Sequence, residues 1–523
     1  MKIWQKIKTV LSILLWGLSG AIIAVMYWAY RTFGKQSLLK ILFHLQEPLE
    51  GSNVAAFLPA FIWALIFLVL FAGIGGILQK LFSRELDLMI GIGKIKIRLP
   101  LDFWNRHALI PALLVLVLAL VSVWDFFQVS DFLANRMQKT KIYEEYYVEP
   151  SKAVLTFPEQ KRNLIYIYLE SMENTYMSQE HGGAEYAEFI PELYEIQMNS
   201  TNFAVDGHVN GAVSTYGTEW TMGALVAQSC GIPLNMLIDG NALGEYTDLY
   251  PGAYSLGQIL EQQGYNQVFM MGSAGGFAGR DTFFRKHGNY EIMDYYYAID
   301  AGWIDPDYYV WWGYEDEKLF DHAKKELLKL AEQDAPFNLT MLTVDTHFVG
   351  GYPCELCEDI FGGDQYANVI ACSSRQVNEF VHWIEEQEFY PNTTIVICGD
   401  HPTMDTEYMN VSTAGSVNGY TRKVYTAIIN PVNEYELDYD RQFATIDMYP
   451  TTLASLGVQI EGERLALGTN LFSEEPTLIE IMGSEQLNAE LAKSSKYYED
   501  YILYGCGDEL EIIEEQEAEE SAE

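Results

Sequence analysis

Ionisable side chains directly follow three apolar, strand-like runs of this sequence. The runs are NLIYIYLES (163–171), LTVDTH (342–347) and TTIVICGDH (393–401), and their polar ends carry Glu170, Asp345, His347, Asp400 and His401. Carboxylate oxygens together with an imidazole suit Mn²⁺, Zn²⁺ or Mg²⁺ better than a soft metal. A single Asp-His pair in a loop is more often only solvated, so the prediction depends on the three ends together. If the strands are parallel neighbours, their carboxyl ends share one edge, and the sequence predicts a metal site there.

A second stretch, NGAVSTYGTEWTMGALVAQSCGIPL (210–234), joins small hydroxyl residues to a helical pattern that begins near Glu219. A hydroxyl just before a helix lies among free N–H groups and the positive end of the helix dipole. An oxygen nucleophile that attacks phosphate would be well placed there. The alternative is ordinary N-capping by Ser214, Thr215 or Thr218. The residues alone leave both interpretations open.

Strand-like and helical patterns alternate between residues 163 and 430. Short apolar runs at 163–171, 266–272, 337–347, 393–401 and 424–430 are separated by helical periodicity at 316–333 and 366–387. This alternation predicts an α/β fold with a mostly parallel sheet that is covered by helices on both faces. In such sheets ligands bind beyond the carboxyl ends of the strands.

Three segments near the N-terminus, 9–30, 53–79 and 107–124, contain no Asp, Glu, Lys or Arg. Each has about the length that a helix needs to cross a ~30 Å hydrocarbon layer. We therefore expect a membrane domain (1–124) with three transmembrane helices. Lys and Arg are concentrated in the N-terminus and the 80–106 loop, which predicts that both face the cytoplasm. Everything after residue 125 is then expected outside, beginning with a connector at 125–160.

The formal net charge is −40, and most of the acidic residues follow the predicted membrane domain. A nucleic-acid partner is excluded on this basis, because phosphate binding needs a basic face. The final stretch, DELEIIEEQEAEESAE (508–523), is typical of a solvated, disordered tail. Cysteines in an exported domain tend to pair, so we expect at least one disulfide among Cys354, Cys357 and Cys372.

Five motifs together resemble a known family: YLES, STYGTEWTM, FAGRDTFFRKHG, TVDTHF and CGDHPTM. They occur in the order seen in membrane-anchored phosphoglycerol transferases and lipoteichoic-acid synthases, a branch of the sulfatase and alkaline-phosphatase superfamily. The resemblance covers roughly 160–475 and implies a sulfatase-like catalytic domain at 161–475, followed by a C-terminal extension at 476–523. The cysteine-containing segment after His347 is more similar to the transferases that modify osmoregulated glucans.

Residue by residue, the resemblance implies the following roles. Glu170, Asp400 and His401 match metal ligands, and Thr215 matches the nucleophile, which also contacts the metal. Arg280 matches an arginine that holds the substrate phosphate, and His347 a histidine near the glycerol phosphate. The implied cofactor is a divalent metal, with Mn²⁺ preferred over Zn²⁺ or Mg²⁺.

The implied reaction moves glycerophosphate from phosphatidylglycerol, through a threonine-linked intermediate, to a glycan or polyglycerolphosphate acceptor of the cell envelope. The expected location is the cell membrane, with the catalytic domain extracytoplasmic. One alternative is phosphoethanolamine transfer by the same architecture. A second alternative, of another class, is an inactive ectodomain that senses a ligand.

Overall fold

The computed structural model describes residues 2–33, 58–82, 87–92, 95–100, 107–205, 207–235, 249–405, 408–409 and 420–506. The chain divides into two compact units. One contains Met1–Leu38 and Asn53–Phe132, and the other contains Leu39–Ser52 and Leu133–Glu523. We call them the helical unit and the sheet unit and describe each by itself. The predicted acidic tail (508–523) lies outside the described residues.

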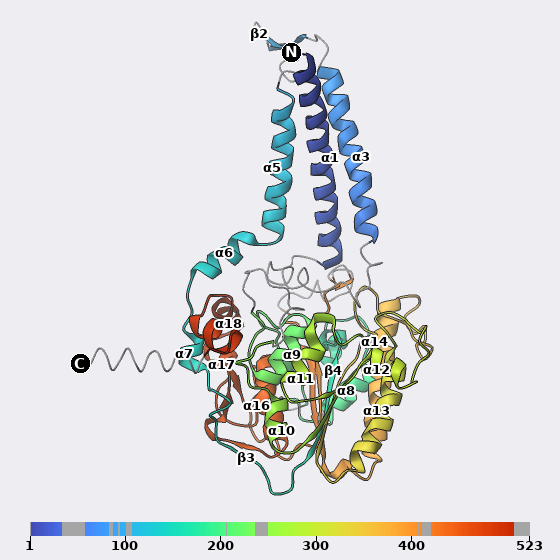
Figure 1. Ribbon diagram of the computed structural model, residues 1–523, viewed down its shortest axis with the longest axis vertical. Helices are drawn as coiled ribbons and strands as arrows, with labels where there is room; N and C mark the ends of the chain where they lie inside the picture. The colour runs from blue at the N-terminus through green and yellow to red at the C-terminus, as the bar shows by residue number, and fades with distance from the viewer. Residues whose placement is uncertain are drawn as a thin grey trace, which may run out of the picture. The chain divides into compact units, whose positions relative to one another are not determined.

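The helical unit is built on three apolar helices, α1 (Lys2–Phe33), α3 (Leu58–Phe82) and α5 (Leu109–Phe126). All three are long and apolar enough to cross a membrane, over Lys6–Thr32, Leu58–Leu81 and Leu109–Phe126, as expected from the sequence. Within this unit α1 packs against α3 and α5 (Figure 1). A Cβ on Gly20 of α1 would collide with the α3 backbone, so a small residue permits this close approach. A hairpin of β1 (Asp87–Ile92) and β2 (Ile95–Pro100) lies between α3 and α5 in the sequence.

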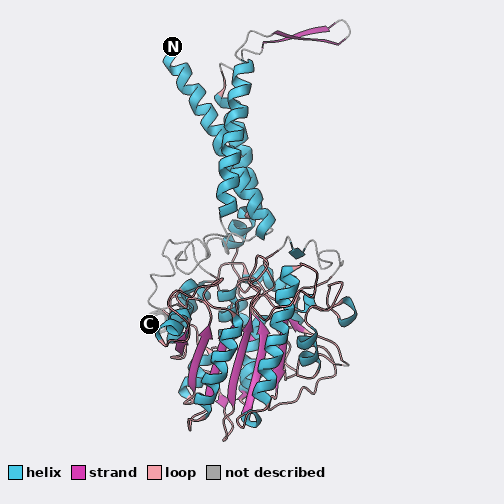
Figure 2. Ribbon diagram, turned by 90° about the vertical axis from the view of Figure 1, so that its right-hand side faces the viewer, coloured by secondary structure: helices cyan, strands magenta, loops and turns pink. Residues whose placement is uncertain are grey.

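A seven-stranded sheet forms the centre of the sheet unit, in the order β5-β10-β9-β4-β8-β6-β7 (Figure 2). The strands are β5 (Gly211–Ala212), β10 (Val424–Ile429), β9 (Thr393–Gly399), β4 (Asn163–Leu169), β8 (Phe337–Leu342), β6 (Asn266–Met271) and β7 (Glu291–Met293). Pairing is parallel from β9 to β7, whereas β10 is antiparallel to β9 and β5 is antiparallel to β10. The predicted mostly parallel sheet is confirmed.

Helices cover both faces of this sheet, which explains why its strands are almost continuously apolar. On one face β4 contributes Ile165 and Ile167 to a core shared with residues of α8 (Pro191–Met198), α13 (Asp316–Ala331) and α14 (Gln365–Glu385). On the other face the hydroxyl of Tyr166 donates to Gln228 of α9. The second layer contains α9 (Thr221–Cys230), α10 (Leu256–Gln262) and α16 (Met448–Ser455).

The remaining elements are short. They are α6 (Val129–Met137), α7 (Ile142–Tyr146), β3 (Leu155–Thr156), α11 (Arg280–Lys286), α12 (Tyr295–Asp300), β11 (Gln459–Ile460), β12 (Arg464–Leu465), β13 (Gly468–Thr469), α17 (Leu478–Met482) and α18 (Ser484–Leu491). The segment expected to be a connector thus contains α6, α7 and β3. Tyr143 of α7 is buried, and its ring centroid lies 5.2 Å from that of Tyr498.

The register of the parallel strands determines whether the predicted site residues lie at the same edge of the sheet. Leu169 at the end of β4 pairs with Gly399 at the end of β9, and Tyr168 pairs with Leu342 at the end of β8. The three strands run parallel, so the residues that follow them emerge at the same level of one edge. The chain segments predicted to carry chemistry are therefore neighbours in space.

Asp345, one of the acidic residues after β8, has a structural partner in Asp316 at the start of α13. Asp345 Oδ2 accepts from the Asp316 amide at 3.2 Å, while Asp316 Oδ1 and Oδ2 accept from the amides of Val344 and Asp345 at 2.8 and 2.9 Å. Asp345 Oδ1 is buried without a hydrogen-bond partner. Burial raises the pKa of Asp316 to about 7, and burial and the Asp316 charge raise that of Asp345.

We predict that Asp345→Asn reduces the loss of stability that the protein shows at rising pH. A carboxyl group whose pKa is higher in the folded than in the unfolded state stabilises the fold at low pH. This stabilisation is lost as the pH rises through the folded-state pKa, which is about 7 for Asp316. The amide keeps one oxygen for the Asp316 N–H and removes one buried charge. The variant should be more stable than the wild type by about 1–2 kcal/mol at alkaline pH, measured by thermal unfolding across pH. Asp321 lies on the exposed side of α13, so Asp321→Asn should show the same dependence of stability on pH as the wild type. If Asp345→Asn also showed the wild-type dependence, the pairing of Asp316 with Asp345 would be contradicted.

Gly399 ends β9 where the chain has no room for a side chain. A Cβ there would overlap the carbonyl oxygen of Met172, whereas a Cβ on Gly276 would meet no atom within 4 Å. We predict that Gly399→Ala lowers the free energy of unfolding by about 3 kcal/mol or more, because backbone must shift. Gly276→Ala, at an ordinary φ of −66°, should change it by less than about 0.5 kcal/mol. If the two variants unfolded at the same temperature, the end of β9 would have room for a Cβ, and the close contact with Met172 would be contradicted.

Candidate active site

Glu170, Asp400 and His401 come together at the carboxyl edge of the sheet. Glu170 follows β4, and Asp400 and His401 follow β9. One potential ligand atom from each lies within 4.8 Å of the others, and all three side chains are buried. The prediction that these strand ends meet is borne out by their positions.

Backbone groups orient the two residues after β9. Asp400 Oδ1 accepts from the amides of Ser171 and His401, both at 2.7 Å. Asp400 Oδ2 is buried and has no hydrogen-bond partner, although it lies 3.4 Å from His401 Nε2. His401 Nδ1 lies 3.0 Å from the Pro402 carbonyl, which can only accept, so in the neutral imidazole Nδ1 carries the hydrogen and Nε2 presents its lone pair. That lone pair faces the carboxylates, with Glu170 Oε1 at 3.7 Å.

The electrostatics of this cluster are unfavourable for charged carboxyl groups alone. Burial raises the pKa of Glu170, and the Asp400 carboxyl raises it further. Burial also raises the pKa of Asp400 to about 7. A divalent cation would reverse this preference, because it stabilises the charged form of each carboxylate. Two carboxylates, one imidazole lone pair and the unpartnered Asp400 Oδ2 therefore fit a hard or borderline divalent metal.

A hydroxyl group that the sequence reasoning did not select also lies at this cluster. Thr221 is the first residue of α9, and its Oγ1 is 3.3 Å from Glu170 Oε2 and 3.4 Å from His401 Nε2. The helix begins at Thr221, two residues later than Glu219. Trp220 occupies the N-cap position and makes no side-chain cap. Placing the helix start correctly in TEWTM would have identified this threonine.

Thr215, the predicted nucleophile, lies in the turn before α9. Its amide donates to Thr218 Oγ1 at 2.8 Å and its carbonyl accepts from the Thr218 amide at 2.9 Å. Its own hydroxyl is buried without a hydrogen-bond partner. Within the described part of the chain, no hydrogen bond joins this hydroxyl to Glu170, Asp400 or His401. The catalytic assignment of Thr215 stays a prediction.

Arg280 and His347 line the same pocket as Glu170 and Thr221. The pocket opens to solvent, and its wall is completed by Phe277, Trp312, Ser273, Ala278, Leu342, Thr343 and Val344. Carbonyls of Ala274 and Phe277 accept from the Arg280 guanidinium at 2.9 and 3.0 Å and fix its direction.

His347 is partly buried beside the Trp312 ring, with centroids 4.7 Å apart. Its Nδ1 lies 2.7 Å from the Phe348 carbonyl, so Nδ1 holds the hydrogen and Nε2 is an acceptor. Burial lowers the pKa of His347, although the Glu170 charge acts in the opposite direction. The neutral imidazole is therefore suited to receive a proton. Trp312 lies in a segment without a recognisable motif, whereas Phe277 opens the FAGRDTFFRKHG motif, in which the resemblance assigned a role only to Arg280.

The chain is similar to proteins of known families. Residues 162–411 match the family model described as Sulfatase. Phosphoglycerol transferase I of Citrobacter koseri is 32% identical over 314 residues, or 57% of this chain and 39% of the relative. Phosphoglycerol transferase I of Salmonella paratyphi B is 30% identical over 386 residues, or 71% of this chain and 46% of the relative. The chain thus spans less than half the length of these curated relatives.

Two solved structures show more distant similarity. Lipoteichoic acid synthase LtaP from Listeria monocytogenes has a TM-score of 0.47 at 19% identity, covering 60% of this chain and 75% of that one. Lipooligosaccharide phosphoethanolamine transferase A (EptA) from Neisseria meningitidis has a TM-score of 0.47 at 13% identity, and the match covers 86% of this chain and 84% of that one. The sequence match identifies residues 162–411 as a sulfatase-family domain.

Proposed function

We propose that this chain is a metal-dependent phosphotransferase that moves glycerophosphate from phosphatidylglycerol to a cell-envelope acceptor. The observation that carries the proposal is the position of Thr221. Its hydroxyl lies at the first residue of α9, in contact with Glu170 and His401 and in the same pocket as Arg280 and His347. The names of the phosphoglycerol transferase relatives support the choice of glycerophosphate.

Glu170, Asp400 and His401 are the proposed metal ligands, with the Thr221 hydroxyl as a fourth donor. A divalent metal bound there would lower the pKa of the hydroxyl and offset charge on the phosphoryl oxygens. Mn²⁺ is our preferred metal, because oxygen donors dominate the set, and Zn²⁺ or Mg²⁺ are the alternatives. In this proposal Thr221 replaces Thr215 in the role that the resemblance suggested.

In the first half-reaction Thr221 Oγ1 attacks the phosphorus of the donor phosphodiester, and the bond to the diacylglycerol oxygen breaks. His347 Nε2 takes the hydroxyl proton and returns it to the departing diacylglycerol oxygen. Arg280 holds phosphate oxygens with its fixed guanidinium, and free N–H groups at the start of α9 add donors. The product is a glycerophosphoryl-threonine.

In the second half-reaction an acceptor hydroxyl attacks the same phosphorus and the bond from phosphorus to Thr221 Oγ1 breaks. His347 Nε2 takes the acceptor proton and returns it to Thr221 Oγ1, which regenerates the threonine. The acceptor is a glycan or a polyglycerolphosphate chain. Phosphoethanolamine as the transferred group remains the nearest alternative, because the pocket residues that contact phosphate would be the same. A ligand-sensing ectodomain without turnover is the alternative from another class, and the assay below separates it from an enzyme.

A lipid donor also explains the apolar helices. We propose that α1, α3 and α5 anchor the protein in the cell membrane and that the sheet unit is extracytoplasmic. Lys and Arg are more frequent in the N-terminus and the 80–106 segment than in the 31–52 segment, which supports this orientation.

We predict that Thr221→Ala lowers the release of diacylglycerol from headgroup-labelled phosphatidylglycerol by about a thousandfold or more, because covalent transfer is lost. Thr215→Ala is the matched control and should retain activity within about tenfold, since its hydroxyl makes no hydrogen bond to the cluster. Both variants should unfold at temperatures close to that of the wild type.

If Thr215→Ala were inactive and Thr221→Ala active, Thr215 would be the nucleophile instead of Thr221. If the wild type released no diacylglycerol from any phospholipid donor with Mn²⁺, Zn²⁺ or Mg²⁺, the enzyme proposal would fail and the sensor would be favoured.

Orientation is tested separately. Protease added to intact spheroplasts should digest the portion after residue 125, because we place it outside. A cytoplasmic marker protein must stay intact in the same sample. Complete protection of the C-terminal portion, with digestion only after lysis, would reverse the proposed topology.

A further inference from the structure

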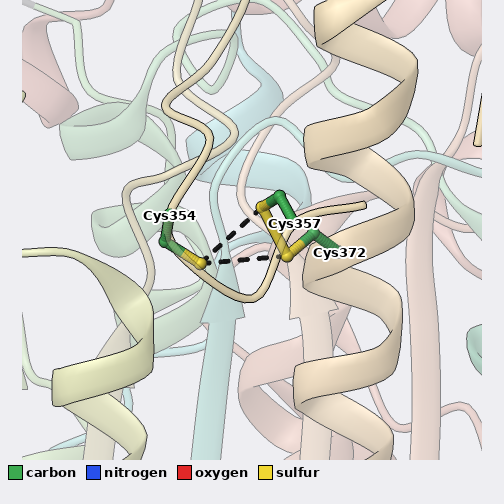
Figure 3. A group of neighbouring side chains, drawn as sticks. All are labelled: Cys354, Cys357 and Cys372. Carbon is green, nitrogen blue, oxygen red and sulfur yellow. Dashed lines mark hydrogen bonds between the residues drawn. A yellow bond between two sulfur atoms is a disulfide. The ribbon is translucent and has the colours of Figure 1, made fainter. Parts of the chain in front are cut away.

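Three sulfur atoms meet at α14, and none of the three cysteines lines the pocket described above. Cys354 and Cys357 lie in the segment after β8, and Cys372 lies on α14 (Figure 3). Cys357 and Cys372 form a disulfide, which confirms the expectation of at least one disulfide in this group. Cys354 Sγ is 3.6 Å from Cys357 Sγ and 3.9 Å from Cys372 Sγ. One buried thiol therefore contacts both sulfurs of a disulfide.

We propose that, once the Cys357–Cys372 bond is reduced, the three sulfurs form a binding site for a thiophilic cation such as Zn²⁺ or Cd²⁺. The disulfide closes this site, so oxidation and cation binding exclude one another. This inference does not depend on the proposed transferase function.

The distances already present are those that such a cation needs. With Zn–S bonds of about 2.3 Å, two thiolates of a tetrahedral site lie about 3.8 Å apart. The two sulfur–sulfur distances from Cys354, 3.6 and 3.9 Å, are close to this value. The third distance, between the sulfurs of Cys357 and Cys372, is short only because these atoms are covalently bonded. Reduction of the bond lets the two sulfurs move apart. Cys357 is the least buried of the three and lies in a turn, so it has the most room to move.

Gln376 gives an independent reason to expect a ligand here. It follows Cys372 by one turn of α14 and is 6% exposed. Its Nε2 lies 3.5 Å from Cys372 Sγ and 3.7 Å from Cys354 Sγ, while its Oε1 is buried without a hydrogen-bond partner. The amide N–H groups can stabilise thiolates that bind a cation. Alternatively, rotation of the amide directs the oxygen to the sulfurs and supplies a fourth ligand.

The surrounding charges favour a cation over a free thiolate. Burial raises the pKa of Cys354 to about 11, and the carboxyl groups of Asp345, Glu317 and Asp316 contribute in the same direction. A cation bound by the sulfurs would be attracted by these carboxylates and would deprotonate the thiol.

The chemistry has two balanced steps. An added phosphine reductant supplies two electrons to the disulfide, which takes up two protons and becomes the thiols of Cys357 and Cys372. Binding of a divalent cation by the three sulfurs then releases the thiol protons to solvent. Affinity should accordingly rise with pH.

The test is a Cd²⁺ titration of the full chain in detergent, after phosphine reduction and removal of the reductant. The readout is the ultraviolet charge-transfer absorption between thiolate and cadmium, which oxygen ligands at Glu170 and Asp400 cannot produce. We expect the band to saturate at one thiolate-bound Cd²⁺ per reduced chain, at least tenfold weaker thiolate binding in Cys354→Ser, and no band in unreduced protein. Cys506→Ser, which changes a cysteine outside the cluster, should bind as the wild type does.

Unfolding temperature, read on the same samples, guards against a variant that fails to fold. Cd²⁺ should raise the unfolding temperature of the reduced wild type and of C506S by more than that of C354S, which lacks one of the three sulfur ligands. The proposal is overturned if thiol counting confirms reduction and the wild type shows no band. It is equally overturned if C354S gives the same band and affinity as the wild type.

Discussion

The feature on which the site depends is the burial of two carboxyl groups beside one imidazole at the edge of a parallel sheet. Glu170, Asp400 and His401 are each at most 2% exposed. Uncompensated charges in that position are costly, and burial raises the pKa of both acids. A chain that keeps such a cluster needs a compensating cation or protons, and the orientation of the His401 lone pair suits a cation.

The rest of the sheet unit can be understood as the means of holding this cluster in place. Parallel register brings the ends of β4, β8 and β9 to one level. The start of α9 adds the Thr221 hydroxyl, and the start of α11 adds Arg280, whose direction two carbonyls fix. The Asp316–Asp345 contact attaches α13 to the segment after β8, which carries His347. Each of these groups is supplied from a helix start or a strand end, which are the rigid parts of the fold.

Much of this arrangement could be predicted from the sequence, for a physical reason. Strands buried on both faces are almost continuously apolar, so β4, β6, β8, β9 and β10 stood out, and their polar ends identified Glu170, Asp400 and His401. The three apolar helices were predictable from length and absence of charge. Asp345, in contrast, follows a strand as the possible ligands do, and the sequence pattern does not separate it from them. Only the packing of α13 shows that its carboxyl accepts from the Asp316 amide.

The choice among hydroxyl residues before α9 could not be made from sequence, because it depends on the residue at which the helix begins. A shift of two residues in that start changes which hydroxyl faces the strand ends. Trp312 and Phe277 reach the pocket wall from segments between strands, where no periodicity predicts direction. Such positions follow from tertiary packing, which local patterns do not encode.

The most direct test of the site is the metal content of the purified full chain. The protein would be kept unreduced, so that the disulfide stays closed, equilibrated with equal amounts of Mn²⁺, Zn²⁺ and Mg²⁺, freed of unbound ions and measured by mass spectrometry of the elements. We predict one divalent ion per chain in the wild type and in Thr215→Ala, a large loss in Asp400→Ala, and a lower unfolding temperature after chelation. A wild type that retains no ion, or an Asp400→Ala variant that retains as much as the wild type, would contradict the assignment of this cluster as a metal site.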